Sequence, residues 1–285
     1  MPVCQHNQVN KIAAIQMNSS DSKKDNLETV ARLVEEAALI HQAGLVLLPE
    51  NFALFDGKAA LELGVQEAAA NGEVRCFISS LAKKYSVWII AGSIPCASRP
   101  DGSLIDGRVR SSCWVFDDRG AEVIRYDKIH LFDVDVSDSH GSYRESQQFE
   151  AGINPQIVDT PAGKVGLSIC YDLRFPQLYS WLAGAGAQIL TVPAAFTFKT
   201  GEAHWLLLLR ARAVENQCYV IAANQTGVHS KGRETWGHSM IIDPWGEVIV
   251  CAEEGEGVIS AEINLQTLSD IRSAMPVLKH RKLIK

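Results

Sequence analysis

The sequence predicts an α/β fold in which two mixed sheets pack face to face and helices cover their outer faces. Short apolar runs, typical of buried strands, alternate with amphipathic stretches along the chain. Three segments, 111–128, 157–170 and 240–250, have the pattern of hairpins, and hairpins add antiparallel pairs to helix-linked strands. A purely parallel sheet fits this combination less well.

The expected elements follow one another without a linker. Asp25 with Glu28 resembles a capping box that begins a first helix, and Gly44 offers its C-terminal stop. Other helices are expected at 58–85, 176–184 and 202–217, and strands outside the hairpins at 11–17, 45–49, 87–95, 187–193 and 219–224. No stretch rich in Pro, Gly and Ser interrupts this series, so we expect one domain over residues 1–285.

Each hairpin has its own turn sequence. The first turns at Asp118-Arg119-Gly120 and the third at Asp243-Pro244-Trp245-Gly246. The second turns at Pro161-Ala162-Gly163, and its returning arm, KVGLSIC, is expected to end on Cys170.

Composition narrows the function classes. The hydrophobic fraction of 47% is ordinary for a globular protein, and a net charge of -6 without a basic patch argues against binding to nucleic acid or an anionic membrane. A small molecule is the expected partner. Seven cysteines without a CxxC pair and a beginning without an apolar signal core favour reduced thiols and a cytoplasmic location.

No cofactor is expected. Two glycine-rich stretches, 182–189 and 253–258, match neither GxGxxG nor GxxxxGK, so phosphate binding is not predicted there. The cysteines and histidines show no metal-ligand spacing, so no metal is expected either.

Three expected strands end in a polar residue that an apolar environment would otherwise exclude. LVLLPE ends in Glu50, VIRYDK in Lys128 and VGLSIC in Cys170. A rigid strand fixes such a side chain while the following loop opens a pocket. Each residue alone also has an ordinary structural explanation, as a cap, a surface charge or a small buried side chain. Their joint occurrence is what suggests a site.

These segments resemble the nitrilase superfamily of carbon-nitrogen hydrolases. LLPEN (47–51), YDKIHLFD (126–133) and CYDLRFP (170–176) resemble its glutamate, lysine and cysteine motifs, in the family's order. The resemblance implies a four-layer αββα sandwich and a homodimer, for which the apolar helix at 202–217 is a candidate contact surface. Further stretches resemble the Nit branch, and within it the deaminated glutathione amidases: 127–136, 142–146, 193–197, 200–205, 210–218 and 232–247.

The resemblance also implies catalytic roles. Cys170 would attack an amide carbonyl, and Glu50 would act as the base, because an ordinary thiol is mostly protonated at neutral pH. Lys128 and the backbone N–H of Tyr171 would stabilise the oxyanion. Glu145, in SYRES, would hold Lys128 and the substrate in register.

Substrate recognition has open alternatives. Arg174 could pair with a substrate carboxylate or form a structural ion pair, and Phe196 and Thr197 could line the pocket or pack in the core. The expected substrate is a small amide bearing a carboxylate, first of all deaminated glutathione. Other ω-amides, N-carbamoyl compounds and nitriles remain alternatives.

Two other hypotheses compete with the nitrilase-type amidase. A papain-like hydrolase would use a histidine as base, for which His130, His204 and His238 are available. Alternatively, the chain could be a catalytically silent interaction protein, because the presence of residues does not prove turnover.

Overall fold

The computed structural model describes residues 10–57, 59–135 and 141–282, and the expectation drawn from the first residues of the chain lies outside this part. Two six-stranded sheets form its centre. The first contains, in spatial order, β16 (Gly257–Glu262), β1 (Lys11–Gln16), β2 (Leu45–Leu47), β3 (Trp88–Cys96), β4 (Arg110–Phe116) and β5 (Glu122–Asp127). The second contains β15 (Val248–Cys251), β14 (Met240–Ile242), β11 (Tyr219–Asn224), β10 (Ile189–Ala194), β9 (Gly163–Gly166) and β8 (Ile157–Thr160).

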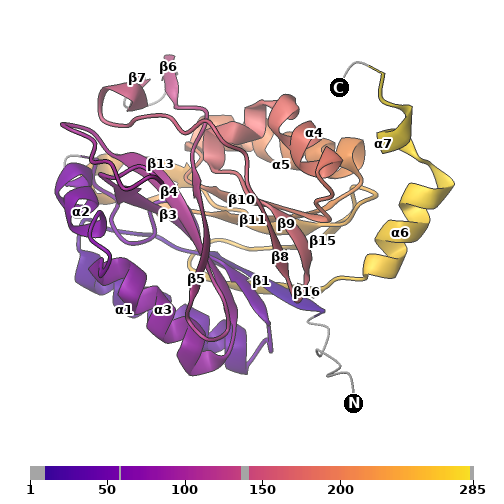
Figure 1. Cartoon of the computed structure of the whole chain (residues 1–285), viewed down its shortest axis with the longest axis horizontal. Coiled ribbons are helices and arrows are strands. Elements are labelled where there is room, and N and C mark those ends of the chain that lie inside the picture. Colours follow the sequence, from indigo (N-terminus) through magenta and orange to yellow (C-terminus); the bar gives the residue numbers. More distant parts are fainter. Residues whose placement is uncertain (1–9, 58, 136–140, 283–285) are drawn as a thin grey trace.

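Helices flank the two sheets, with the last two along the chain at one side of the molecule near the C-terminus (Figure 1). They are α1 (Lys23–Leu39), α2 (Ala60–Glu67), α3 (Glu73–Tyr85), α4 (Pro176–Gly184), α5 (Phe198–Asn216), α6 (Leu265–Ala274) and α7 (Val277–His280). Helices α1 and α3 lie outside the first sheet, and α4 and α5 lie outside the second. The predicted αββα sandwich is therefore confirmed.

Both sheets are mixed, as expected from the hairpins. In the first sheet, β1, β2 and β3 are parallel, whereas β16, β4 and β5 pair antiparallel with their neighbours. In the second sheet, β9, β10 and β11 are parallel, whereas β8, β14 and β15 are antiparallel. The two sheets therefore have matching plans, with a parallel centre and antiparallel edges.

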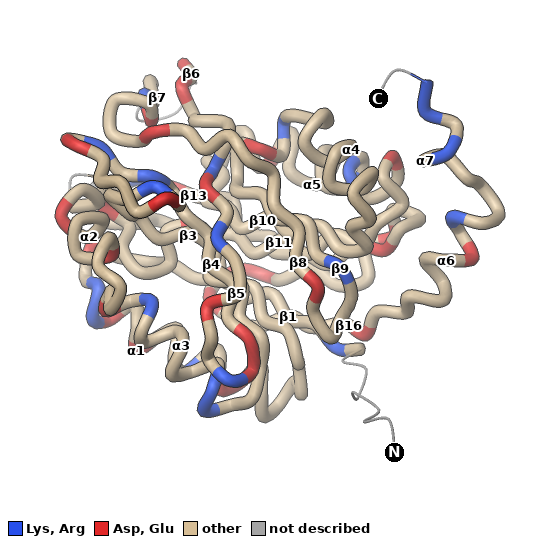
Figure 2. Tube along the Cα trace, in the orientation of Figure 1, with Lys and Arg blue, Asp and Glu red and all other residues tan. Residues whose placement is uncertain are grey.

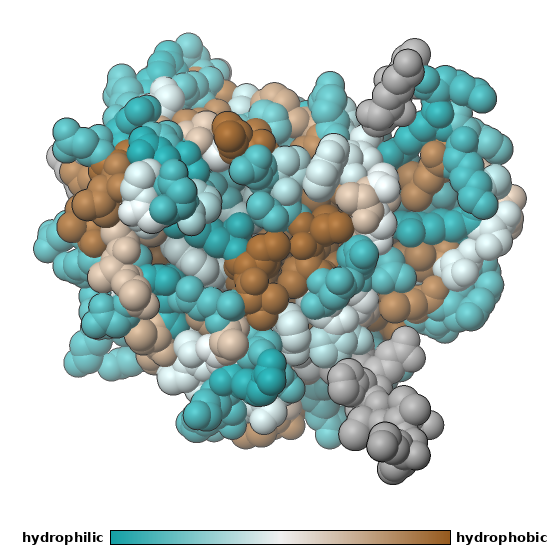
Figure 3. Space-filling model, viewed as in Figure 1, coloured by the Kyte–Doolittle hydropathy of each residue, from teal (hydrophilic) through white to brown (hydrophobic). Residues whose placement is uncertain are grey.

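The core follows from the alternation of side chains along each strand. In β1, Ile12 and Ala14 belong to the apolar cluster that includes the second sheet, while Ala13 and Ile15 pack in the cluster that includes α1 and α3. All four are fully buried, which is why this strand is a continuous apolar run. Figure 3 shows apolar side chains gathered where the edge strands β5 and β8 run in Figure 1.

Three expected boundaries were wrong. Helix α1 begins earlier than expected, because Ser22 is its N-cap and accepts a hydrogen bond from the Asp25 backbone N–H at 3.3 Å. It ends at Leu39, before Gly44. The segment 58–85 contains two helices rather than one, since the buried Glu67 carboxylate accepts the Val74 backbone N–H at 2.8 Å and starts α3 anew.

The predicted end of the second hairpin, at residue 170, was also wrong. Strand β9 ends at Gly166, and Cys170 instead begins a short 3-10 helix, η2 (Cys170–Arg174). Helix α5 begins four residues before the expected position 202. Short elements were not predicted at all: β6 (Asp133–Asp135), β7 (Ser142–Arg144), η1 (Glu145–Gln147), β12 (Thr226–Val228), η3 (Ser230–Gly232) and β13 (Glu234–Trp236).

Acidic and basic residues are interspersed along the trace (Figure 2). Within the described ranges, no helix combines the length and apolarity needed to cross a bilayer.

Candidate active site

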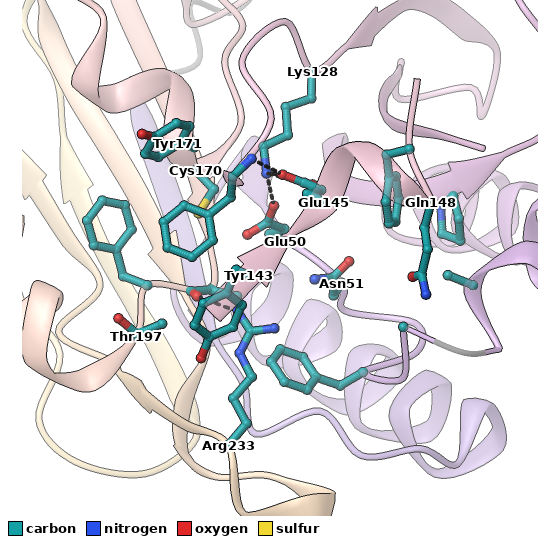
Figure 4. A pocket seen from close by; sticks show the side chains of 18 of the residues that line it. Glu50, Asn51, Lys128, Tyr143, Glu145, Gln148, Cys170, Tyr171, Thr197 and Arg233 are labelled. Atoms are coloured by element: carbon teal, nitrogen blue, oxygen red, sulfur yellow. Dashed lines mark hydrogen bonds and ion pairs between the residues drawn. The ribbon is translucent and has the colours of Figure 1, made fainter. Parts of the chain in front are cut away.

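Four residues far apart in the sequence converge at one place (Figure 4). The Lys128 Nζ atom lies 2.9 Å from Glu50 Oε1 and 2.9 Å from Glu145 Oε1. The Cys170 thiol interacts electrostatically with both Glu50 and Lys128. The structure therefore brings together all four residues that the sequence singled out for catalysis.

Glu50 is held through its backbone. It follows β2 by three residues, and its carbonyl oxygen accepts a hydrogen bond from Gln225 Nε2 at 2.9 Å. The next residue, Asn51, has φ +58°, a left-handed conformation that Asn tolerates better than most residues. The Asn51 N–H donates to Ser93 Oγ at 3.0 Å. These bonds fix the sharp turn that directs the Glu50 carboxylate inward.

Lys128 is a buried cation at the end of β5. Its backbone N–H donates to the Ser111 carbonyl at 2.9 Å, and its side chain is only 2% exposed. Burial alone lowers the pKa of an ammonium, but the nearby carboxylates of Glu145 and Glu50 outweigh it and raise the pKa of Lys128 well above its ordinary value. Lys128 therefore stays charged at neutral pH.

Glu145 is not a solvated loop carboxylate. It opens η1, and its Oε2 atom accepts the Phe132 backbone N–H at 2.6 Å. Burial raises the pKa of Glu145, Lys128 opposes this, and the neighbouring Glu50 adds to the rise. The backbone bond and the ammonium together fix the position of this side chain.

Cys170 lies in a strained turn. Its φ is +47°, in the left-handed region that costs an ordinary residue about 1–2 kcal/mol. The buried Asp172 carboxylate stabilises this turn, because it accepts hydrogen bonds from the Ile169 N–H at 2.9 Å and from the Tyr126 hydroxyl at 2.6 Å. His130 donates its backbone N–H to the same carboxylate at 3.0 Å.

The Cys170 thiol is protonated at rest. Burial raises the pKa of this thiol, Glu50 raises it further, and Lys128 only partly opposes them, so the pKa is well above its ordinary value. A thiolate therefore forms only if a base takes the proton, and Glu50 is the carboxylate beside it.

A cavity of about 340 Å³ opens onto this cluster. That volume is typical of a small-molecule site. Tyr171, Arg174, Phe196 and Thr197 all line it, together with the four residues of the cluster. Phe196 also packs on Trp205, with ring centroids 4.8 Å apart, so it is both a core residue and a wall of the cavity.

Arg174 lies at the wall of the cavity without a carboxylate. Its guanidinium carbon lies 5.5 Å from the Phe196 ring centroid and 6.0 Å from that of Tyr171. None of the ion pairs between described residues includes Arg174. The structural ion pair considered for this residue is therefore not seen there.

Sequence reasoning missed several residues that also line the cavity, among them Asn51, Tyr143 and Arg233. Asn51 directly follows Glu50, Tyr143 lies in the SYRES stretch, and Arg233 lies in GRETWGHS. Each belongs to a stretch that resembles the nitrilase superfamily, but no local pattern distinguishes the residue from its neighbours.

The histidines of the papain-like alternative are engaged elsewhere. His130 Nδ1 lies 2.7 Å from Asp172 Oδ1, His204 Nδ1 lies 3.3 Å from an Arg174 nitrogen, and His238 Nδ1 lies 2.8 Å from a backbone carbonyl. No group of three or more possible metal ligands occurs in the part of the chain that the structure describes.

Known proteins are similar to this chain over nearly its whole length. Residues 11–273 match the model of the carbon-nitrogen hydrolase family. The chain is 41% identical to a deaminated glutathione amidase of Yersinia enterocolitica, covering 96% of this chain and 93% of that protein. It is 42% identical to a deaminated glutathione amidase of Mus musculus, covering 95% and 83%.

A solved structure gives the same result for the fold. The crystal structure of Saccharomyces cerevisiae Nit3, a member of branch 10 of the nitrilase superfamily, superposes with a TM-score of 0.84 at 32% identity over 96% of each chain. The chain therefore belongs to the carbon-nitrogen hydrolase family, within the nitrilase superfamily.

Proposed function

We propose that this hydrolase cleaves the amide bond of a small, carboxylate-bearing amide through a thioester on Cys170, with deaminated glutathione as the first candidate substrate. The observation that supports it most is the convergence of a thiol, a carboxylate and a buried ammonium at one cavity of about 340 Å³. The names of the relatives in Yersinia enterocolitica and Mus musculus support the choice of substrate.

In the first half of the reaction, Glu50 takes the thiol proton as the Cys170 sulfur bonds to the amide carbonyl carbon. Because the resting thiol has a raised pKa, proton transfer has to accompany the attack. Lys128 and the Tyr171 backbone N–H stabilise the resulting oxyanion. When the C–N bond breaks, Glu50 returns its proton to the departing amine and a thioester remains.

In the second half, Glu50 deprotonates a water molecule that attacks the thioester carbonyl. The C–S bond breaks, the carboxylic acid leaves, and the proton on Glu50 returns to the Cys170 sulfur. Glu145 exchanges no proton in this scheme. Its contacts with Lys128 Nζ at 2.9 and 3.0 Å support a role in holding the ammonium against Glu50.

Arg174, Phe196 and Thr197 would bind the substrate. A guanidinium at the cavity wall without a carboxylate partner among the described residues suits an anionic substrate, since arginine binds carboxylates in a bidentate geometry. The aromatic and hydroxyl groups of the other two residues would define the adjoining wall.

The assembly and organisation of the chain are also part of the proposal. The family match over residues 11–273 supports one hydrolase domain. Exposed apolar side chains on α5, namely Leu206, Leu207 and Val214, support a homodimer through this helix. A monomeric mass by light scattering would contradict the dimer. A cytoplasmic location, suggested by the cysteine pattern, stays a prediction.

Steady-state kinetics with three compounds test the substrate assignment. We expect kcat/KM to be highest for deaminated glutathione, lower for α-ketoglutaramate and lowest for a simple uncharged amide. Higher activity on an N-carbamoyl compound or a nitrile would contradict the amide assignment. The absence of turnover across the whole panel would contradict the proposed reaction itself.

A further inference from the structure

Arg233 is held in the cavity by two aromatic rings. It lies between η3 and β13, and its side chain extends toward Tyr143 (Figure 4). The guanidinium carbon lies 4.8 Å from the Phe55 ring centroid and 5.4 Å from that of Tyr143. These distances are typical of cation–π contacts. The rings come from different segments, so they hold the guanidinium from two directions.

The stack continues on the far side of Phe55. The rings of Phe55 and His229 are stacked, with centroids 3.8 Å apart and planes inclined by 15°. His229 Nε2 also lies 2.7 Å from Thr235 Oγ1. Burial lowers the pKa of His229 to about 4, and Arg233 adds to this, so the imidazole is neutral at physiological pH. A neutral, hydrogen-bonded ring therefore supports Phe55 beneath the cation.

The polar atoms of Arg233 are incompletely satisfied. One terminal nitrogen donates to the Ala195 carbonyl at 3.2 Å, while the buried Nε has no hydrogen-bond partner among the described residues. The Ser230 hydroxyl, which lines the same cavity, is also buried without a partner there. Burying such groups without partners costs free energy. A bound molecule that supplies a hydrogen-bond acceptor would remove this free-energy cost.

The buried arginines among the described residues are paired with carboxylates. Arg110 lies 2.9 Å from Asp127 and 2.6 Å from Glu150. Arg233, by contrast, takes part in none of the ion pairs found between described residues. An arginine fixed by aromatic rings, facing a cavity and lacking an anion, is arranged to bind one.

We propose that Arg233 binds a carboxylate of the substrate and that it is a specificity-determining residue in addition to Arg174. Each guanidinium rests on its own pair of rings, Tyr171 and Phe196 for Arg174, and Phe55 and Tyr143 for Arg233. Two separate anchors suit an amide with two carboxylates. This inference rests on the proposed amidase function, because deaminated glutathione carries a carboxylate at each end.

Kinetic selectivity gives the first test. In Arg233→Met, the ratio of kcat/KM for deaminated glutathione to that for an uncharged amide should fall about 10- to 100-fold, mainly through KM, as expected for one charge-assisted contact. In Arg233→Lys, which keeps the positive charge but loses the bidentate geometry of the guanidinium, the ratio should fall less. Arg119→Met removes a guanidinium that is 83% exposed in the β4–β5 turn and should leave the ratio unchanged. An unchanged ratio in Arg233→Met, or equal losses on both substrates, would overturn the inference.

A binding measurement separates this inference from the proposed reaction. In Cys170→Ala, which cannot form a thioester, calorimetric titration with deaminated glutathione should give a dissociation constant that rises about 10- to 100-fold when Arg233→Met is added. Adding Arg119→Met should not change it. Equal affinities with and without Arg233→Met would overturn the role of Arg233, whereas no binding by either protein would contradict deaminated glutathione as the substrate and the inference that rests on it.

Discussion

Two groups of charged side chains line the same cavity and are held in opposite ways. In the inner group, Lys128 lies beside both Glu50 and Glu145, so each carboxylate has a cation within hydrogen-bonding distance. In the outer group, Arg174 and Arg233 rest against aromatic rings and have no carboxylate partner among the described residues. The inner group therefore has its ionic partners within the protein, whereas the outer group lacks an anionic partner among the described residues. On the proposed roles, reaction chemistry and substrate choice are separated in space.

Removing the base should change the inner group most. In Glu50→Gln, kcat/KM should fall about 10²- to 10⁴-fold, the usual contribution of general acid–base catalysis. Stability should change little, because Lys128 keeps its contacts with Glu145. Steady-state kinetics and thermal unfolding check both expectations, with Glu28→Gln, on the exposed side of α1, as the matched control. Near-normal turnover would mean that another group is the base.

Removing the cation should damage both activity and stability. In Lys128→Met, kcat should fall about 10²- to 10³-fold through loss of oxyanion stabilisation. Two buried carboxylates would also lose their partner, which lowers the free energy of unfolding by about 3–5 kcal/mol. Lys24→Met, whose side chain is 84% exposed, is the matched control.

A second substitution sharpens this prediction. Adding Glu145→Gln to Lys128→Met removes one of the unpaired carboxylates, so denaturant unfolding should show partial recovery of stability without recovery of kcat. If activity recovered together with stability, the role of Lys128 would be structural.

Substitution of Glu150, which lies outside the cavity, should have the smallest effect on activity. The Glu150 carboxylate ties the segment after η1 to the first sheet, because it lies 2.7 Å from Arg99 and 2.6 Å from Arg110. A hydrogen bond from Arg99 lowers the pKa of Glu150 most, burial opposes it, and a hydrogen bond from Arg110 lowers it further. The resulting pKa is about 2. A lowered pKa stabilises the fold above the ordinary carboxyl pKa of about 4.3, and this contribution is lost as pH falls toward about 2.

We therefore expect Glu150→Gln to lower the free energy of unfolding by about 1–3 kcal/mol at pH 7. As the pH falls, the free energy of unfolding of this variant should decrease less steeply than that of the wild-type protein. Urea unfolding between pH 7 and pH 3 measures this difference. Activity at pH 7 should fall only a few-fold. Parallel pH profiles for the two proteins would show that the ion pairs contribute nothing.

The sequence was sufficient for two packed mixed sheets because apolar runs and hairpin turns are local patterns. The convergence of the inner group, by contrast, was predicted only through the resemblance to the nitrilase superfamily, because its residues are far apart in the chain. The apolar run of β1 and the turn at Asp118–Gly120 are local, and the motifs around Glu50, Lys128 and Cys170 are contiguous. Glu145 was identified through the SYRES stretch alone. Strand ends were less predictable: KVGLSIC remains apolar beyond Gly166 although the chain leaves the sheet there.

The wall of the cavity was harder to predict for a physical reason. Arg233 is identified only by what surrounds it, and Phe55 and Tyr143 lie far from it in the sequence. An arginine in a loop gives no local sign of whether it meets water, a carboxylate or two aromatic rings. The start of α1 does carry a local signal, because Ser22 and Asp25 have the Ser-x-x-Asp spacing of a capping box, and pairing Asp25 with Glu28 was the wrong choice.

Mass spectrometry of acid-quenched reactions is the most direct test of the central claim that Cys170 and Glu50 act together. After brief mixing with deaminated glutathione, the wild-type peptide containing Cys170 should gain the mass of the acyl group, and the same peptide of Glu50→Gln should remain unmodified over the same time. An adduct on another residue, or equal acylation of Cys170 in both proteins, would contradict the account.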